Sequence, residues 1–322
     1  MEVETIVLLS LKLRRDHNVK RLRKIFRFLF SFVFFLTSFG VYMTNRIMYI
    51  RKKDDQVILK REKEAGRFNP DAFSQTPRKK VKIPSPFSYD ITLILVEPHP
   101  TNRYVIFSHG VTENKVNSVK YMNLFLERGF NAVLYDHRRH GESGGKTTSY
   151  GYYEKFDLKA VVHWLKKEKG PDLLLGIHGE SMGAATMLLY AGLVEDGADF
   201  YIADCPFSDF SEQLSYLLKK DMKLPPKPLL PVADVFLRMR EKYSLRDISP
   251  ISVIKHVKKP VLFVHSREDD YILPQMSKDL YEKKTGAKKL FLAPKGKHAQ
   301  SLNQNKELYE AAVDEFLTEF VF

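Results

Sequence analysis

The sequence is poor in the residues that form covalent or metal cross-links. It contains one cysteine, Cys205, so no disulfide can form within the chain. Cys205 ends the apolar run 200–203, which predicts a small buried hydrophobe in place of a nucleophile. The chain has no H-E-x-x-H pair, no paired cysteines and no phosphate-binding P-loop. We therefore expect neither a metal nor an organic cofactor.

Internal repeats and low-complexity tracts are also missing, and the net positive charge is small outside one region. The 322 residues carry a formal net charge of +13, which by itself would suggest a nucleic-acid partner. Residues 1–67, however, hold sixteen Lys and Arg against seven Asp and Glu. The excess belongs to the N-terminal region, so the sequence predicts no nucleic-acid partner. Hydrophobic residues make up 44% of the whole chain, which is enough to form one large catalytic domain.

An uncharged stretch of seventeen residues, from Phe28 to Thr44, predicts a membrane-spanning helix. Eight basic residues precede it: Lys12, Arg14, Arg15, Lys20, Arg21, Arg23, Lys24 and Arg27. We expect an uncleaved single-pass anchor. Because fewer basic residues follow the stretch than precede it, the N-terminus should be cytoplasmic and the catalytic domain extracytoplasmic. Two alternatives stay open. Ser38, Phe39 and Gly40 resemble a secretory cleavage site, which would give a secreted protein, and the helix could also be buried or interfacial.

The chain divides into three predicted parts. Residues 1–51 form the basic N-terminus and anchor, residues 52–88 a charged and proline-containing linker into the domain, and residues 89–322 the catalytic domain. Short apolar runs in that domain predict strands at 90–96, 103–107, 131–135, 172–177, 200–204, 261–264 and 289–292. Helical patterns occupy 119–128, 153–169, 182–194, 276–284 and 303–320. This alternation predicts an α/β fold with a doubly wound, mostly parallel sheet.

One interval departs from the alternation. Residues from about 206 to 250 combine several prolines with apolar helical pieces. We interpret the interval as a small helical lid over the site, with an ordinary surface excursion as the alternative.

The run Gly179, Glu180, Ser181, Met182, Gly183 follows an apolar strand and precedes a helix. This order is typical of a nucleophile elbow, in which a G-x-S-x-G turn exposes a serine hydroxyl at the end of a parallel sheet. The glycines stand where strand and helix cross closely, so a Cβ at either position would strain the turn. Ser181 is the predicted nucleophile.

Ser181 needs an imidazole to accept its proton and a carboxylate to orient that imidazole. In this arrangement both partners follow the serine along the chain. His298 lies in a loop after the strand 290–292 and is the predicted base. The loop after the strand 261–265 offers Asp269, our first choice as the acid, with Asp270 as the alternative.

Backbone amides should stabilise the oxyanion that forms during the reaction. Met182 follows the nucleophile at a helix start, and Val111 lies in the loop after the strand 103–107, so we predict their amides as the two donors. His109, in the same loop, is predicted to position the loop. Asp136 and Arg139 are predicted to tie loops together in a rigid turn under the site.

Together these segments resemble the α/β-hydrolase superfamily, and specifically bacterial membrane-anchored serine hydrolases of the YqkD type. That type lies near the monoacylglycerol lipase and prolyl oligopeptidase branches. The resemblance rests on His109 with Gly110, on the D-x-R-x-H-G-x-S segment 136–143, on the elbow, and on Asp269 and His298. It implies an N-terminal anchor as well.

The residues and the resemblance lead to one functional hypothesis. We expect a serine hydrolase that cleaves small-molecule acyl substrates, foremost carboxylic esters, through a Ser-His-Asp triad and an acyl-enzyme. Two alternatives remain: a peptidase or amidase with the same triad, and a non-catalytic binding protein with a hydrolase fold.

Overall fold

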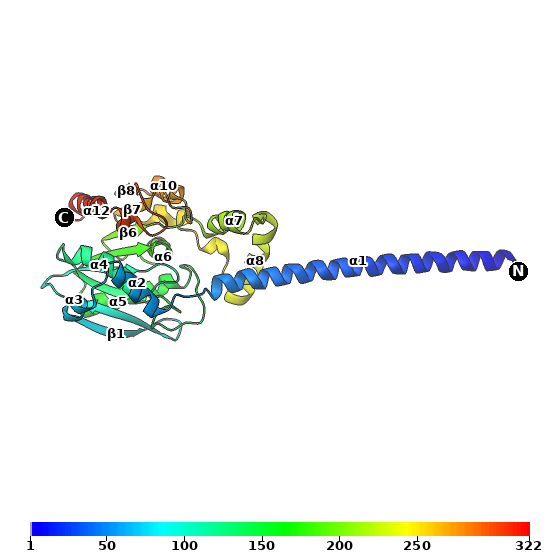
Figure 1. The fold of residues 1–322 in the computed structure, drawn as a ribbon, viewed down its shortest axis with the longest axis horizontal. Coiled ribbons are helices and arrows are strands. Elements are labelled where there is room, and N and C mark those ends of the chain that lie inside the picture. The colour runs from blue at the N-terminus through cyan, green and yellow to red at the C-terminus, as the bar shows by residue number, and fades with distance from the viewer. Residues whose placement is uncertain (1) are drawn as a thin grey trace.

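A twisted eight-stranded sheet forms the centre of the molecule in the computed structural model, which describes the backbone of residues 2–322 (Figure 1). Side chains are described at residues 14, 15 and 17–322; Met1 and the side chain of Lys12, both in the predicted basic segment, lie outside the described residues. The strands are β1 (Arg78–Pro84), β2 (Asp90–Val96), β3 (Arg103–Ser108), β4 (Asn131–Tyr135), β5 (Leu174–Glu180), β6 (Phe200–Asp204), β7 (Val261–Ser266) and β8 (Lys288–Ala293).

The strand order is β1-β2-β4-β3-β5-β6-β7-β8. β2 is antiparallel to β1 and to β4, and from β4 to β8 every neighbouring pair is parallel. The predicted mostly parallel sheet is confirmed, and each predicted strand corresponds to one of β2–β8; β1 was not predicted. Because parallel strands end at the same edge, the loops after β3, β5, β7 and β8 meet there.

Some helices cover the two faces of the sheet, and others lie away from it. They are α1 (Glu2–Met48), α2 (Asp55–Glu64), α3 (Pro70–Gln75), α4 (Val119–Leu126), α5 (Glu154–Lys169), α6 (Met182–Leu193), α7 (Phe210–Asp221), α8 (Pro226–Glu241), α9 (Pro250–Val253), α10 (Pro274–Lys283), α11 (Ser301–Gln304) and α12 (Lys306–Phe320). Short 3₁₀ turns occur at Lys115–Ser118, Leu245–Asp247 and Ile254–His256.

Helical periodicity decides which side of each helix faces the sheet. In α5, Leu158, Val161, Val162 and Leu165 repeat at the spacing of one helix face, and all four are buried with α6 and α10 on one side of the sheet. α4 and α12 are buried on the other side. The sheet thus has one apolar core on each face. These two cores hold the central strands in place and so position the loops at the strand ends.

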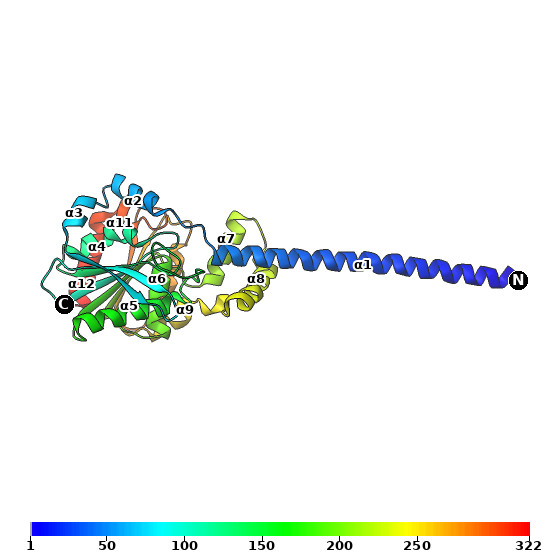
Figure 2. The same cartoon turned by 90° about the horizontal axis from the view of Figure 1, so that it is seen from below.

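α1 extends far beyond the rest of the molecule (Figures 1 and 2). Within it, the stretch His17–Met48 is long and apolar enough to cross a membrane. Its phenylalanines from Phe28 to Phe35 are exposed, whereas Phe39 and Met43 are buried against α7 and α8. The interval 206–250 thus forms two helices that pack on the end of α1.

The charged segment 52–88 contains regular structure that its sequence did not predict. α2 begins at the N-cap Asp54, whose Oδ1 accepts a hydrogen bond from the Gln56 amide at 2.8 Å. α3 begins at Asn69 in the same way, and β1 then joins the sheet edge beside β2. Figure 2 shows α2 and α3 lying over one side of the sheet near α4 and α11.

Candidate active site

Ser181 stands on a sharp turn between β5 and α6. Its backbone has φ 55° and ψ −115°, a strained conformation for a residue with a side chain. A Cβ added to Gly179 would lie 2.5 Å from the backbone of Ala184, and one added to Gly183 would lie 1.9 Å from the Ser108 carbonyl oxygen. The steric role predicted for both glycines is therefore confirmed, because only glycine allows strand and helix to cross this closely.

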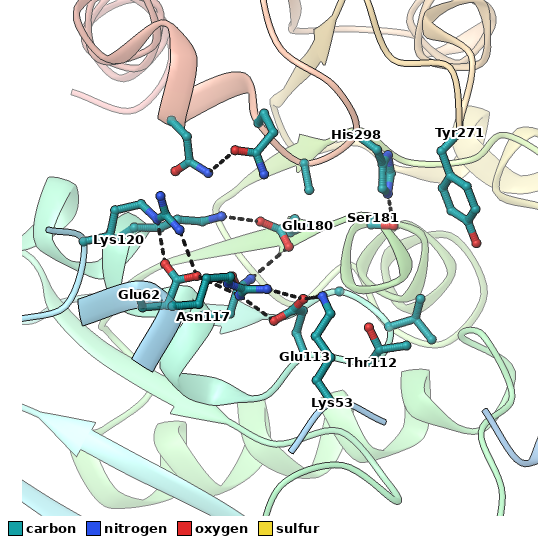
Figure 3. A pocket seen from close by; sticks show the side chains of 17 residues that line it. Lys53, Glu62, Thr112, Glu113, Asn117, Lys120, Glu180, Ser181, Tyr271 and His298 are labelled. Carbon is teal, nitrogen blue, oxygen red and sulfur yellow. Dashed lines mark hydrogen bonds and ion pairs between the residues drawn. The ribbon is translucent and has the colours of Figure 1, made fainter. Parts of the chain in front are cut away.

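His298 contacts the serine from the loop after β8. Its Nε2 lies 2.8 Å from Ser181 Oγ, and its Nδ1 lies 2.7 Å from Asp269 Oδ2. A carboxylate only accepts hydrogen bonds, so Nδ1 carries the ring proton and Nε2 accepts from the serine hydroxyl. The structure therefore brings Ser181, His298 and Asp269 into one hydrogen-bonded chain, of which Figure 3 shows the bond between Ser181 and His298.

Asp269 is buried and held from several directions. Its Oδ1 accepts from the amides of Tyr271 at 2.9 Å and Ile272 at 3.0 Å, and its Oδ2 accepts from His265 Nε2 at 3.1 Å. Burial acts to raise the pKa of Asp269, but the hydrogen bonds from His265 and His298 outweigh it and hold the pKa below its ordinary value. The carboxylate thus stays ionised at neutral and mildly acidic pH.

Sequence reasoning missed the role of His265. This histidine ends β7 and is fully buried; its Nε2 lies 2.9 Å from the Ile272 carbonyl oxygen as well as within bonding distance of Asp269. Its Nδ1 accepts from the Ser277 hydroxyl at 2.7 Å. His265 therefore orients the carboxylate and its loop. The available signal was a polar residue at the end of an otherwise apolar strand.

The predicted oxyanion donors lie beside the serine. Val111, Met182 and Ser181 line one small pocket, and Met182 is the first residue of α6, where the amide has no carbonyl one turn earlier in the helix. His109 is buried beneath the loop: its Nδ1–H donates to the Gly110 carbonyl at 2.8 Å and its Nε2 accepts from the His137 amide at 3.0 Å. Burial lowers the pKa of His109, which keeps it neutral.

The turn after β4 ties loops together as predicted. Asp136 accepts from the amide and the ammonium group of Lys115 at 2.8 and 2.6 Å, and from the Glu142 amide at 2.9 Å. Arg139 Nη1 donates to the Ile50 carbonyl at 2.8 Å, which joins this turn to the end of α1.

Two cavities open at Ser181. The charged cavity has a volume of about 350 Å³ and is lined by Ser181, His298, the loop Gly110–Glu113 and charged side chains (Figure 3). The apolar pocket is smaller, about 40 Å³, and contains Ser181, Val111 and Met182. Its remaining lining residues are Tyr150, Phe207, Phe210, Gln213, Leu214, Leu217, Tyr271 and Ile272. Residues 206–250 thus help to form a pocket beside the serine.

Residues 53–67, which contain α2, also contribute side chains to the charged cavity. Arg61 Nη1 and Nη2 donate to the two carboxylate oxygens of Glu113 at 3.1 and 2.7 Å, and the ammonium group of Lys53 also bonds Glu113. Burial acts to raise the pKa of Glu113, but its bonds with Arg61 and Lys53 lower it to about 2. The Lys53 amide donates to the Thr112 carbonyl at 3.2 Å. These bonds fasten α2 to the loop that carries Val111.

Cys205 is buried next to the site, as its apolar surroundings predicted. Its Sγ lies within 4.8 Å of ligand atoms of Asp269 and His298. Burial raises the pKa of the Cys205 thiol well above its ordinary value. A neutral thiol is a weak nucleophile and a weak metal ligand, and the other two groups already bond each other, so these residues fit a metal ion poorly.

Comparison with known proteins shows the family of this chain. The sequence profile of the family described as serine aminopeptidase, S33, matches residues 99–252. The protein YqkD of Bacillus subtilis is 50% identical over 297 residues, which cover 92% of this chain and 97% of YqkD. This chain belongs to the α/β-hydrolases of the YqkD type.

More distant similarities support the same superfamily. The lysophosphatidylserine lipase ABHD12 of Danio rerio is 28% identical over 60% of this chain and 49% of its own length. The Pyrococcus furiosus esterase Pf2001 shares the fold with a TM-score of 0.65 at 24% identity, over 79% of this chain and 95% of that one. The α/β-hydrolase described here is accordingly an enzyme of the serine hydrolase type.

Proposed function

We propose that this α/β-hydrolase cleaves carboxylic esters through Ser181, His298 and Asp269. The observation that carries the proposal is the hydrogen-bonded chain, with 2.8 Å from Ser181 Oγ to His298 Nε2 and 2.7 Å from His298 Nδ1 to Asp269 Oδ2. A serine hydroxyl becomes a strong nucleophile only beside such a base. A non-catalytic binding protein would not need this geometry on a strained turn.

In the proposed reaction, Ser181 Oγ attacks the ester carbonyl carbon while His298 Nε2 takes its proton. The oxyanion lies between the amides of Val111 and Met182. His298 then returns the proton to the alcohol oxygen, the bond from carbon to that oxygen breaks, and an acyl-serine remains. Water activated by His298 hydrolyses the acyl-serine and regenerates the free hydroxyl.

The two cavities suggest how a substrate lies in the site. The leaving alcohol takes its proton from His298, and His298 lines the charged cavity but not the apolar pocket. The alcohol part therefore lies in the charged cavity. The acyl part then enters the apolar pocket beside Val111 and Met182, whose volume of about 40 Å³ favours a short acyl chain.

A peptidase or amidase remains the second candidate, because the matching profile is described as a serine aminopeptidase and the same three residues can cleave amides. Parallel assays with a p-nitrophenyl ester and an aminoacyl p-nitroanilide separate the two. The ester proposal expects the higher kcat/KM on the ester.

The direct test of the proposal uses a fluorophosphonate probe on the full-length protein. We expect covalent labelling of the wild type and none of Ser181→Ala, whose esterase kcat should fall about 10⁴-fold or more because the nucleophile is gone. Cys205→Ser serves as the control, since it changes a neighbouring buried residue that has no part in the reaction. Equal labelling of the Ser181→Ala protein would overturn the assignment.

We further propose that α1 anchors the enzyme in a membrane, with the N-terminus cytoplasmic and the hydrolase domain outside. By length and composition the helix fits an anchor or a signal sequence equally. Its packing favours the anchor, because cleavage after Gly40 would remove Phe39 from the core that it forms with α7 and α8.

A further inference from the structure

The N-terminal segment contributes cations to the cavity that holds Ser181 and His298. Lys53 precedes α2, Arg61 belongs to α2 and Arg67 follows it, and all three line the charged cavity. The domain itself contributes Glu113, Lys120 and Glu180 to this cavity, and the side chains of Lys120 and Glu180 form a buried ion pair at 2.8 Å. The pair of Lys120 and Glu180 carries no net charge. The net charge of the cavity wall therefore depends on Glu113 and on residues 53–67, the α2 segment.

The cations of this segment are more exposed than the carboxylates that bind them. The carboxylates of Glu113 and Glu62, which bind the three cations, have side chains only 9 and 2% exposed. The side chains of Lys53, Arg61 and Arg67 are 43, 36 and 25% exposed. The carboxylates are therefore largely covered, and the cations are the charged groups that solvent reaches. An incoming molecule meets positive charge first.

The count of charges points the same way. Three cations share two carboxylates, because Lys53 and Arg61 bond Glu113 while Arg61 and Arg67 bond Glu62. One positive charge thus remains without compensation. In a partly enclosed cavity such an excess attracts an anion more strongly than it would on an open surface.

We propose that this cationic wall binds an anionic group, a carboxylate or a phosphate, on the alcohol part of the ester. The inference rests on the proposed esterase function, which assigns the alcohol to the cavity of His298. Guanidinium and ammonium groups are the side chains that bind both anions. The enzyme therefore prefers esters whose alcohol carries negative charge, and the α2 segment determines this preference.

The test compares esters that share an acetyl group and differ in the charge of the alcohol. We use 4-acetoxybenzoate, its neutral analogue 4-acetoxybenzamide, and 4-acetoxyphenyl phosphate, with full-length enzyme in detergent. We expect a higher kcat/KM for at least one anionic ester than for the neutral one, with a preference that weakens as salt is raised from about 0.05 to about 0.5 M. The two anionic substrates distinguish carboxylate from phosphate recognition.

The double variant Lys53→Gln, Arg67→Gln removes two of the cations and leaves the Arg61 contacts with Glu113 and Glu62 in place. We expect the ratio of kcat/KM for the anionic ester to that for the neutral ester to fall about fivefold to tenfold. The matched control is the double variant Lys60→Gln, Lys63→Gln, which removes two positive charges from α2 at exposed side chains outside the cavity. The control should keep the wild-type ratio.

A binding measurement separates this inference from the proposed function. Calorimetry with 4-hydroxybenzoate and phenyl phosphate on Ser181→Ala needs no turnover, and binding should weaken when Lys53→Gln and Arg67→Gln are added. If no ester is cleaved but binding behaves as expected, the esterase proposal fails and the anion site stands. An active enzyme with the same substrate ratio in the wild type and the double variant overturns the anion site.

Discussion

Asp269 and Asp270 are neighbours in the chain with opposite surroundings. Asp269 is buried and bonds His298 and His265. Asp270 is exposed, and its Oδ2 lies 3.5 Å from the ammonium groups of Lys220 and Lys297. Only Asp269 can orient the imidazole, so the structure favours it as the triad acid.

We therefore predict that Asp269→Asn lowers kcat about 10³- to 10⁴-fold, because an amide no longer favours the required tautomer of His298. The measurement is steady-state hydrolysis of a p-nitrophenyl ester, with thermal unfolding to confirm that the variant folds. Asp270→Asn is the matched control and should stay within about threefold of wild type, as expected for an exposed ion pair. The reverse pattern would assign the acid to Asp270.

At the scale of secondary-structure elements, the end of α1 packs against α8, which belongs to the interval 206–250. Gly40 allows this contact, because a Cβ at its position would lie 2.3 Å from the ring of Phe236. Arg240 adds polar bonds, donating to Asn45 Oδ1 at 2.7 Å and to the Thr44 hydroxyl. The end of α1 thus supports α8 and the neighbouring α7, and α7 helps to line the apolar pocket.

We predict that Gly40→Val pushes α8 away from α1 and destabilises this contact by about 1–3 kcal/mol, the usual effect of overpacking. Limited proteolysis should then cut between residues 206 and 250 faster than in the wild type. Ser38→Val introduces the same side chain at an exposed position of the same helix and should leave the cleavage rate unchanged. Equal cleavage of all three proteins would show that the helices do not depend on this contact.

At the scale of the whole molecule, apolar surface continues from α1 onto the neighbouring helix. Val33 of α1 and Val235 of α8 line one apolar groove, and both side chains are exposed. A soluble protein rarely leaves such a continuous apolar surface in water. We interpret it as the region that contacts the bilayer.

Cell fractionation should accordingly recover the full-length protein in the membrane pellet. Protease added to intact cells with an accessible outer surface should degrade the hydrolase domain and spare a tag fused to the N-terminus. A tag exposed outside would reverse the orientation. Recovery of a shortened protein in the medium would support the cleaved signal.

The elbow and the sheet could be predicted because their signals are local. Apolar runs and the glycines around Ser181 report strand, turn and helix within a few residues of chain. The segment 52–88 could not be predicted, because α2 depends on caps and on bonds from Arg61 to Glu113, fifty-two residues away. Helix stability of that kind comes from tertiary contacts and leaves no periodic pattern.

The sequence alone was enough to predict the α/β order of elements, the nucleophile elbow at Ser181 and the apolar stretch near the N-terminus. It also placed Asp269 and His298 in the loops that follow two strands beyond the elbow. These features depend on neighbouring residues, whose spacing can be read directly. The folded structure was needed to show that Asp269, and not Asp270, faces the imidazole of His298. It was also needed to show that His265 orients the carboxylate and that the α2 segment lines the cavity with cations. Such contacts join parts of the chain that no local pattern relates, because they form only when the sheet brings its loops to one edge.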